Sequence, residues 1–256
     1  TLSLHDALPI YGSAYHGFAR NRDVPTVADS LETALATVCR HPTSIVGAGR
    51  TDAGVHAWGQ VVSADLPDDT DLDQLARRLN AICGPTLAVR RAEWAPDPGF
   101  NARFDALWRH YRYTILNTPG PDPFLRHTTW HIPHPLDLDR LALACDPFIG
   151  EHDFSSFCRK PKEEPGDDPV SLRRRILLAE WSRPADGLLR LDIRANAFCH
   201  NMVRSITGTM VDVGLGRRPE PGPAILLRPQ LSCPRRQPAV WCRAPDWRST
   251  SQQSAG

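Results

Sequence analysis

The sequence predicts an α+β fold in which helices cover one face of a sheet. Both halves of the chain alternate short apolar runs with segments of helical periodicity. Adjacent strands are joined by short turns, which is typical of split β-α-β (ferredoxin- or RRM-like) units. A chain of 256 residues, 41% of them hydrophobic, can bury one large core or two modest ones. We expect two such subdomains, at 10–98 and 99–220.

The first half contains two helices and several strands. A capping-box start at Thr26 predicts a helix over about 26–40. A strand, a tight loop and a second strand follow over 45–64, and the acidic stretch 65–73 is typical of a solvated turn rather than a metal site. A second helix and a strand at 86–94 complete this half. The two helices carry apolar residues at helical spacing: Val27, Leu31, Ala34, Leu35 and Val38, then Leu72, Leu75, Ala76, Leu79 and Ile82.

The second half repeats this alternation. A strand is expected at 108–116, a helix between an Asp137 cap and Gly150, and a hairpin over 172–195 with its turn at 183–187. The last helix follows Asn196, and on a 100° wheel Arg204 falls away from its apolar stripe. That stripe consists of Cys199, Met202, Val203, Ile206, Met210 and Val213.

The segment 221–256 breaks the pattern. Six prolines, two cysteines and five arginines crowd it. Neither a helix nor a central strand tolerates that density of proline. We therefore expect 221–256 to be poorly ordered or aberrant.

The loop Gly47–His56 is the strongest candidate for a functional site. Its three glycines permit tight turns and close approach of another molecule, and Asp52 places a carboxylate beside the guanidinium of Arg50. The glycine spacing fits neither a dinucleotide-binding turn nor a P-loop. On local chemistry alone, Asp52 is either a functional carboxylate or a turn cap.

The octamer Gly49-Arg-Thr-Asp-Ala-Gly-Val-His56 resembles the active-site loop of the tRNA pseudouridine synthase A (TruA) family. Five further stretches resemble family motifs in the same order, so that the resemblance covers roughly 10–218: Tyr11–Arg20, Phe100–Phe104, Arg109–Tyr113, Gly150–Phe157 and Asn196–Arg204. Residues 1–9 do not resemble the family. We interpret them as a remnant of sequence processing and exclude them from the expected fold. The resemblance implies the pseudouridine synthase fold, with the two subdomains sharing a mixed sheet and a central cleft.

The resemblance also implies an activity, the isomerisation of uridine to pseudouridine at positions 38, 39 and 40 of the tRNA anticodon stem-loop. Asp52 would be the catalytic carboxylate and Arg204 its partner, while Arg50 would fill the space left by the extruded base. Tyr111 would stack on the uracil. The reaction transfers no electrons and implies no cofactor or metal; the implied partners are tRNA and a second copy of the chain. Further substrate-binding residues would be Thr51, His56 and Arg112.

Two other functions stay open. The chain could bind tRNA without turnover because its terminal segments are altered, which predicts salt-sensitive binding and no isomerisation. It could also be a nucleotide-binding domain of another kind, which would bind a free nucleotide tightly without tRNA.

Charge and cysteine content limit which ligands the protein could bind and in which compartment it could act. The formal net charge is +1, but residues 1–100 carry 8 basic and 12 acidic side chains, whereas residues 101–256 carry 22 and 17. A basic face would therefore belong to the second half, and nearly all of its cations are Arg, which suits phosphate and base recognition. Seven cysteines without a C-x-x-C pair argue against a disulfide framework or zinc knuckle. No apolar run reaches the length of a membrane span, and we expect a cytoplasmic protein.

Overall fold

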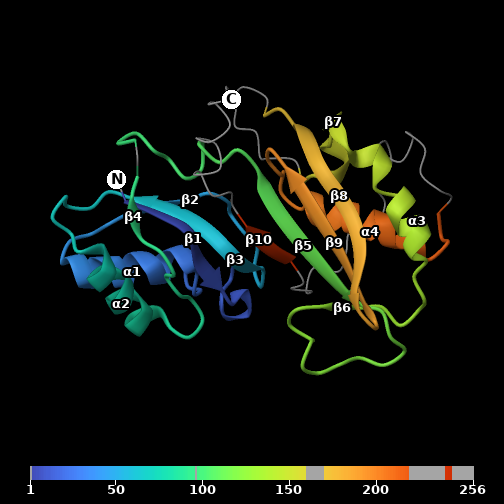
Figure 1. Cartoon of the computed structure of the whole chain (residues 1–256), viewed down its shortest axis with the longest axis horizontal. Helices are drawn as coiled ribbons and strands as arrows, with labels where there is room; N and C mark the ends of the chain where they lie inside the picture. The colour runs from blue at the N-terminus through green and yellow to red at the C-terminus, as the bar shows by residue number, and fades with distance from the viewer. Residues whose placement is uncertain (1, 96, 160–169, 219–239, 244–256) are drawn as a thin grey trace, which may run out of the picture. The chain divides into compact units, whose positions relative to one another are not determined.

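The structure is a computed structural model that describes residues 2–95, 97–159, 170–218 and 240–243. It divides into two compact units (Figure 1). The first contains the described residues up to Arg109 together with strand β10 (Val240–Arg243), and the second begins at His110. Helices and strands alternate in both, which confirms the α+β class. None of the helices within the described residues is long and apolar enough to cross a bilayer.

The sheet of the first unit is mixed. Its strands follow the order β4-β1-β3-β10, and β2 also pairs with β3. β1, β2 and β4 are antiparallel to their neighbours, whereas β10 is parallel to β3. The strands are β1 (Leu2–Ile10), β2 (Ile45–Gly47), β3 (His56–Ala64) and β4 (Glu93–Trp94).

Two helices, α1 (Val27–Cys39) and α2 (Leu72–Cys83), lie together along one side of this sheet in Figure 1. The hydroxyl of Thr26 accepts a hydrogen bond from the Asp29 N–H, and Asp71 caps α2 in the same way. Both predicted helices are confirmed. Their apolar faces pack with the strands in one core that includes Leu8, Leu31, Leu35, Leu75 and Leu79, each at most 2% exposed.

The expectations for both ends of the chain need correction. Residues 2–9, which we excluded from the fold, form β1 together with Ile10, and this strand pairs with β3 and β4. Leu8 and Ile10 are buried in the core. Residues 240–243 form β10 because this short run carries no proline between Pro238 and Pro245. The rest of 221–256 lies outside the described residues.

The strand expected over 86–94 is reduced to β4. Leu87 makes one isolated bridge with Ile10, and the side chain of Asn80 on α2 binds both backbone groups of Val89, at 2.6 and 2.9 Å. An amide side chain thereby satisfies the backbone groups that a neighbouring strand would otherwise pair.

In the second unit the strands follow the order β5-β9-β8-β7, and the short β6 is parallel to β5. β8 is antiparallel to both β7 and β9. The hairpin turn is tighter than expected, because Ala185 pairs with Leu188 and Asp186-Gly187 alone form the loop, with φ of 71° at Gly187. The strands are β5 (Arg109–Leu116), β6 (Trp130–His131), β7 (Gly150–Asp153), β8 (Arg173–Ala185) and β9 (Leu188–Ala195).

Helices α3 (Leu138–Leu143) and α4 (Met202–Gly214) pack beside β8 in this unit (Figure 1). The indole N–H of Trp181 on β8 lies 3.4 Å from the Met210 sulfur on α4. α3 is shorter than the expected 137–150 helix because a short 3-10 helix, η2 (Asp146–Phe148), carries Pro147 and precedes β7. A second 3-10 helix, η3 (Ser155–Phe157), follows β7.

Candidate functional site

The Asp52 loop connects β2 to β3, which pair antiparallel from Ile45 opposite Ala64 to Gly47 opposite Val62. Within the loop, the Val55 N–H donates to the Asp52 carbonyl at 3.1 Å and closes a turn. Gly54 within this turn has φ of 78°, a conformation that favours glycine. The backbone of Asp52 is therefore part of a closed turn at the end of a strand.

The segment before α1 holds this loop from a second direction. The Phe18 N–H donates to the Thr51 carbonyl at 3.0 Å, and the Gly54 N–H donates to the Tyr15 carbonyl at 3.3 Å. At Gly12 an added Cβ would lie only 2.0 Å from the Val55 carbonyl oxygen. The loop thus packs directly on backbone from 12–18, where no larger residue fits at position 12.

His56, the last residue of the motif, lies inside the protein. Its side chain is inaccessible to solvent, its Nδ1 accepts the Gly12 N–H at 3.2 Å, and its ring lies 4.9 Å from that of Tyr11. Because Nδ1 is an acceptor, the neutral ring carries its proton on Nε2. These contacts favour a supporting role for His56 at the base of the loop.

The other three motif residues differ in exposure. Thr51 is buried, Asp52 is half-buried and Arg50 is exposed. Arg50 forms no hydrogen bond or ion pair with the part of the chain that the structure describes. The loop therefore presents a guanidinium to solvent two residues from a partly accessible carboxylate.

Side chains from beyond the motif also fix the loop. The Gln60 amide donates to the Gly49 carbonyl at 2.8 Å, and the Arg109 guanidinium donates to the Ala48 carbonyl through Nε at 3.0 Å and Nη2 at 2.8 Å. Arg109 also binds the Arg103 carbonyl. Arg109 belongs to the motif Arg109–Tyr113, but an arginine at the start of a strand gives no local signal for this contact.

In the second unit, Tyr111 lies on β5 and is half-buried. Its ring meets the ring of Phe198 edge to face, with 5.0 Å between centroids and 88° between planes. Tyr113 and Ile115, which lie on the same face of β5 as Tyr111, are both 0% exposed. The contact joins β5 to the segment 196–201 that leads into α4.

Arg204 lies in the first turn of α4 and is 9% exposed. The helix wheel placed it away from the apolar stripe, but α4 is buried at every position except Ser205. The buried threonines of α4 satisfy their hydroxyls within the helix. Thr207 donates to the Val203 carbonyl at 2.8 Å, and Thr209 donates to the Ser205 carbonyl. Arg204 is therefore a buried cation rather than a solvated one.

Arg112 belongs to a charged cluster that the sequence analysis did not find. The carboxylate of Asp192 on β9 accepts from Arg112 Nε at 3.0 Å and lies 2.8 Å from His110 Nε2 and 2.9 Å from Arg190 Nε. Asp192 is 5% exposed, whereas the side chain of Arg112 is 36% exposed. Burial alone would raise the pKa of Asp192, but the hydrogen bonds from His110 and Arg112 outweigh it and lower that pKa.

A sequence signal for this cluster does exist. Arg190, Asp192 and Arg194 alternate along β9 with the buried Leu191 and Ile193. This alternation predicts one charged face of a strand. It does not reveal that β5 supplies His110 and Arg112 to the same carboxylate, because that requires the order of the strands.

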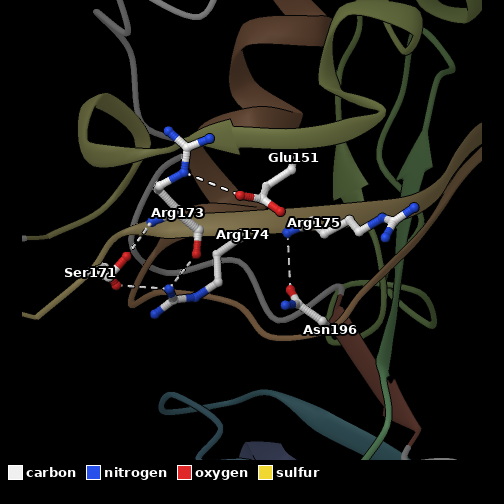
Figure 2. A network of polar contacts seen from close by, with 6 residues as sticks. All are labelled: Glu151, Ser171, Arg173, Arg174, Arg175 and Asn196. Carbon is white, nitrogen blue, oxygen red and sulfur yellow. Dashed lines mark hydrogen bonds and ion pairs between the residues drawn. The ribbon is translucent and has the colours of Figure 1, made fainter.

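A second polar network ties β8 to its neighbours (Figure 2). Arg173 pairs with Glu151 on β7 at 3.2 Å, and Arg174 on the other face of β8 donates to the Ser171 and Arg173 carbonyls. Asn196 accepts the Arg175 N–H through its side chain at 3.0 Å and anchors the start of the 196–201 segment. The network fixes the backbone on which Phe198 and Arg204 are carried.

The predicted site residues are thus arranged within each unit. The first unit gathers Arg50, Thr51, Asp52 and His56 on one supported loop. The second carries Tyr111 beside the segment before α4, Arg204 within α4 and Arg112 in the Asp192 cluster. Among the described residues, no three histidine, cysteine or acidic side chains are grouped as metal ligands.

Comparison with known proteins shows extensive similarity. A sequence model described as tRNA pseudouridine synthase matches residues 144–246. The tRNA pseudouridine synthase A of Frankia casuarinae is 41% identical over 231 residues, which cover 90% of this chain and 80% of the relative. The enzymes of that name from Leifsonia xyli and Bacillus subtilis are 40% and 39% identical, and the matches cover 85% and 80% of this chain and 80% and 81% of the relatives.

Among solved structures, a Cbf5-Nop10-Gar1 complex contains a chain that matches 82% of this one and 46% of its own length. The identity is 12% and the TM-score 0.35, which is too low to support an argument.

Proposed function

The chain belongs to the tRNA pseudouridine synthase A family, a family of isomerases that act on uridine in tRNA, and we propose that its substrates are uridines 38, 39 and 40 of the anticodon stem-loop. The observation that carries this proposal is identity of about 40% to synthases of this name across most of the chain. Binding without turnover is not favoured, because these relatives are named as synthases.

The reaction sets the chemical requirements. The N1–C1′ bond of uridine breaks, the base turns, and C5 joins C1′; the proton lost from C5 is balanced by the proton that N1 gains. No electrons are transferred. The enzyme must hold a detached base and supply a carboxylate that attacks a carbon or removes a proton.

Asp52 is the carboxylate that we assign to this step, either by addition to the sugar or the pyrimidine or by removal of a sugar proton. Its closed turn and the contacts of Thr51 and Gly54 with the 12–18 segment hold the backbone in one conformation. Preorganisation of this kind is what a reacting carboxylate requires.

Arg204 is proposed as the partner that keeps Asp52 ionised and oriented. The support is the resemblance of Asn196–Arg204 to the family motif, together with the burial of the guanidinium in α4. A buried cation is stable only with an acceptor, and a catalytic carboxylate is an acceptor of suitable charge.

The remaining residues are assigned to the substrate. Arg50 is exposed and would enter the stem to occupy the space of the extruded uridine. Tyr111 would stack on the uracil with its ring held by Phe198. Thr51 would contact the substrate at the loop, and Arg112 would meet a phosphate through the Nη groups that its contact with Asp192 leaves unused. His56 would act through the loop that it supports.

The remaining features of the proposal come from the family. The protein would act in the cytoplasm, where its tRNA substrate is found, as a homodimer whose two copies share one tRNA. It would need neither a cofactor nor a metal, because the isomerisation involves no redox step.

The experiment is site mapping on unmodified tRNA. Transcripts carrying a single uridine at position 38, 39 or 40, with cytidine at the other two, are incubated with the purified protein, and pseudouridine is mapped chemically. We expect modification at each of the three positions and none in a transcript with cytidine at all three. Pseudouridine found only outside the anticodon stem-loop would contradict the proposal for the substrate positions while leaving the reaction itself intact.

A further inference from the structure

Two cysteines of the second unit lie together although 40 residues separate them in the sequence. Cys158 follows η3, and Cys199 lies in the segment that precedes α4. The Arg159 N–H donates to the His200 carbonyl at 3.0 Å, which joins the two segments one residue beyond each cysteine. The two side chains also form a hydrogen bond with each other, so the two sulfurs lie within direct reach.

Both side chains are free thiols and both are half-exposed. The other thiols whose side chains are described differ from this pair. Cys83 and Cys145 are buried, and Cys39 is half-exposed on α1 in the first unit. Within the described residues, Cys158 and Cys199 therefore combine access to solvent with a thiol neighbour.

The surroundings shift the pKa values of the two thiols in opposite directions. A hydrogen bond from Cys158 lowers the pKa of Cys199 to about 7, against the effect of burial, and the nearby charge of Arg174 lowers it further while that of Asp153 opposes it. The same hydrogen bond and burial raise the pKa of Cys158. At neutral pH a larger fraction of Cys199 than of Cys158 is therefore thiolate. Cys199 is the nucleophile of the pair and Cys158 the resolving thiol.

We propose that Cys158 and Cys199 form an oxidation site that is converted to a reversible disulfide by hydroperoxides. The Cys199 thiolate attacks one peroxide oxygen, the O–O bond breaks, and an alcohol or water leaves after protonation, so that Cys199 becomes a sulfenic acid. The Cys158 sulfur then attacks the sulfenyl sulfur, forms the S–S bond and releases water. The two sulfurs together lose two electrons, and the peroxide gains them.

The disulfide would join the end of η3 to the segment that carries Phe198 and leads to Arg204. It forms without any need for tRNA. The proposal is therefore independent of the proposed isomerase activity, and its test reads out sulfur chemistry alone.

The test uses the full chain, reduced and then exposed to hydrogen peroxide at pH 7. Thiols are counted before and after, and tryptic peptides are analysed by mass spectrometry without reduction. We expect the thiol count to fall by two, a cross-linked peptide pair containing Cys158 and Cys199, and full recovery of both thiols with dithiothreitol. The rate of thiol loss should rise with pH through a midpoint near 7 because the thiolate is the reactive form.

Three variants separate the roles. Cys158→Ser should leave Cys199 as a sulfenic acid that dimedone traps, whereas Cys199→Ser should slow oxidation of Cys158 by at least about tenfold because its thiolate fraction is small. Cys39→Ser is the matched control, a half-exposed cysteine in the first unit, and should leave the cross-link unchanged. The proposal is overturned if Cys158 and Cys199 survive peroxide as thiols, or if either pairs instead with Cys233 or Cys242.

Discussion

The buried carboxylate of Asp192 on β9 accepts a hydrogen bond from the Nε–H of Arg112 on β5, with 3.0 Å between nitrogen and oxygen. Arg190 contacts the other carboxylate oxygen through its own Nε at 2.9 Å. Both guanidinium groups are thereby held through Nε by one carboxylate. A buried anion thus orders two cations that are each about one third exposed.

Asp192→Asn tests this arrangement through stability. The pKa of Asp192 is lower in the folded chain, so its contribution is complete above the unfolded value of about 3.9 and is lost as pH falls through the folded pKa. At pH 7 we expect the variant to lose about 1–3 kcal/mol of unfolding free energy. Below about pH 4 the wild type should lose part of this extra stability, so that the unfolding free energies of wild type and variant approach each other.

Denaturant unfolding from pH 3 to pH 7 measures both effects. Asp68→Asn is the control, because Asp68 is exposed in a turn and should change stability by less than about 0.5 kcal/mol. A difference between wild type and Asp192→Asn that stays constant over this range would show that the carboxylate charge is not what stabilises the cluster.

Gly12→Ala tests the support of the Asp52 loop. The new Cβ would lie 2.0 Å from the Val55 carbonyl oxygen, so backbone must move. We expect a loss of about 2–4 kcal/mol in stability and a fall in kcat at temperatures where the variant is still folded. Gly120→Ala, where nothing lies within 4 Å of an added Cβ, should change neither. Normal stability and kcat in Gly12→Ala would mean that the loop does not depend on this contact.

Arg50→Gln tests whether Arg50 occupies the space that the extruded uridine leaves in the stem. We expect kcat/KM to fall roughly 10- to 100-fold on a tRNA in which uridine 39 is paired. The loss should be smaller when the partner base is changed so that uridine 39 is already unpaired, since less unstacking energy is then required. Arg22→Gln alters another exposed arginine of the first unit and should have little effect on either substrate. An equal loss on paired and unpaired substrates would contradict this role.

Local sequence signals predicted the local features of the fold well. The Thr26 cap and the spacing of Val27, Leu31 and Leu35 lie within one segment, and α1 forms where they indicate. Residues 1–9 were excluded although leucine stands at positions 2, 4 and 8 and isoleucine follows at position 10, an alternation typical of a strand. β1 depends on pairing with β3, about 50 residues away, and this partner was not apparent from the segment alone.

The candidate site divides in the same way. The octamer identified Asp52 and its glycine turn from adjacent residues. The contact of Gly12 with Val55, the burial of His56 and the shared carboxylate of Asp192 all join segments more than 40 residues apart. Helical periodicity placed Arg204 away from the apolar stripe but could not show that it is buried, because a wheel describes one helix and not the elements that enclose it.

The most direct test of the account is single-turnover pseudouridine formation on anticodon stem-loop tRNA by wild type and Asp52→Asn, with Asp68→Asn as the control. The substitution preserves the shape of a half-buried side chain and removes its charge. We expect Asp52→Asn to bind tRNA within about threefold of wild type and to lose at least about a thousandfold in rate, while Asp68→Asn is unchanged. Product formed by Asp52→Asn at the wild-type rate would contradict the assignment of Asp52 as the catalytic carboxylate.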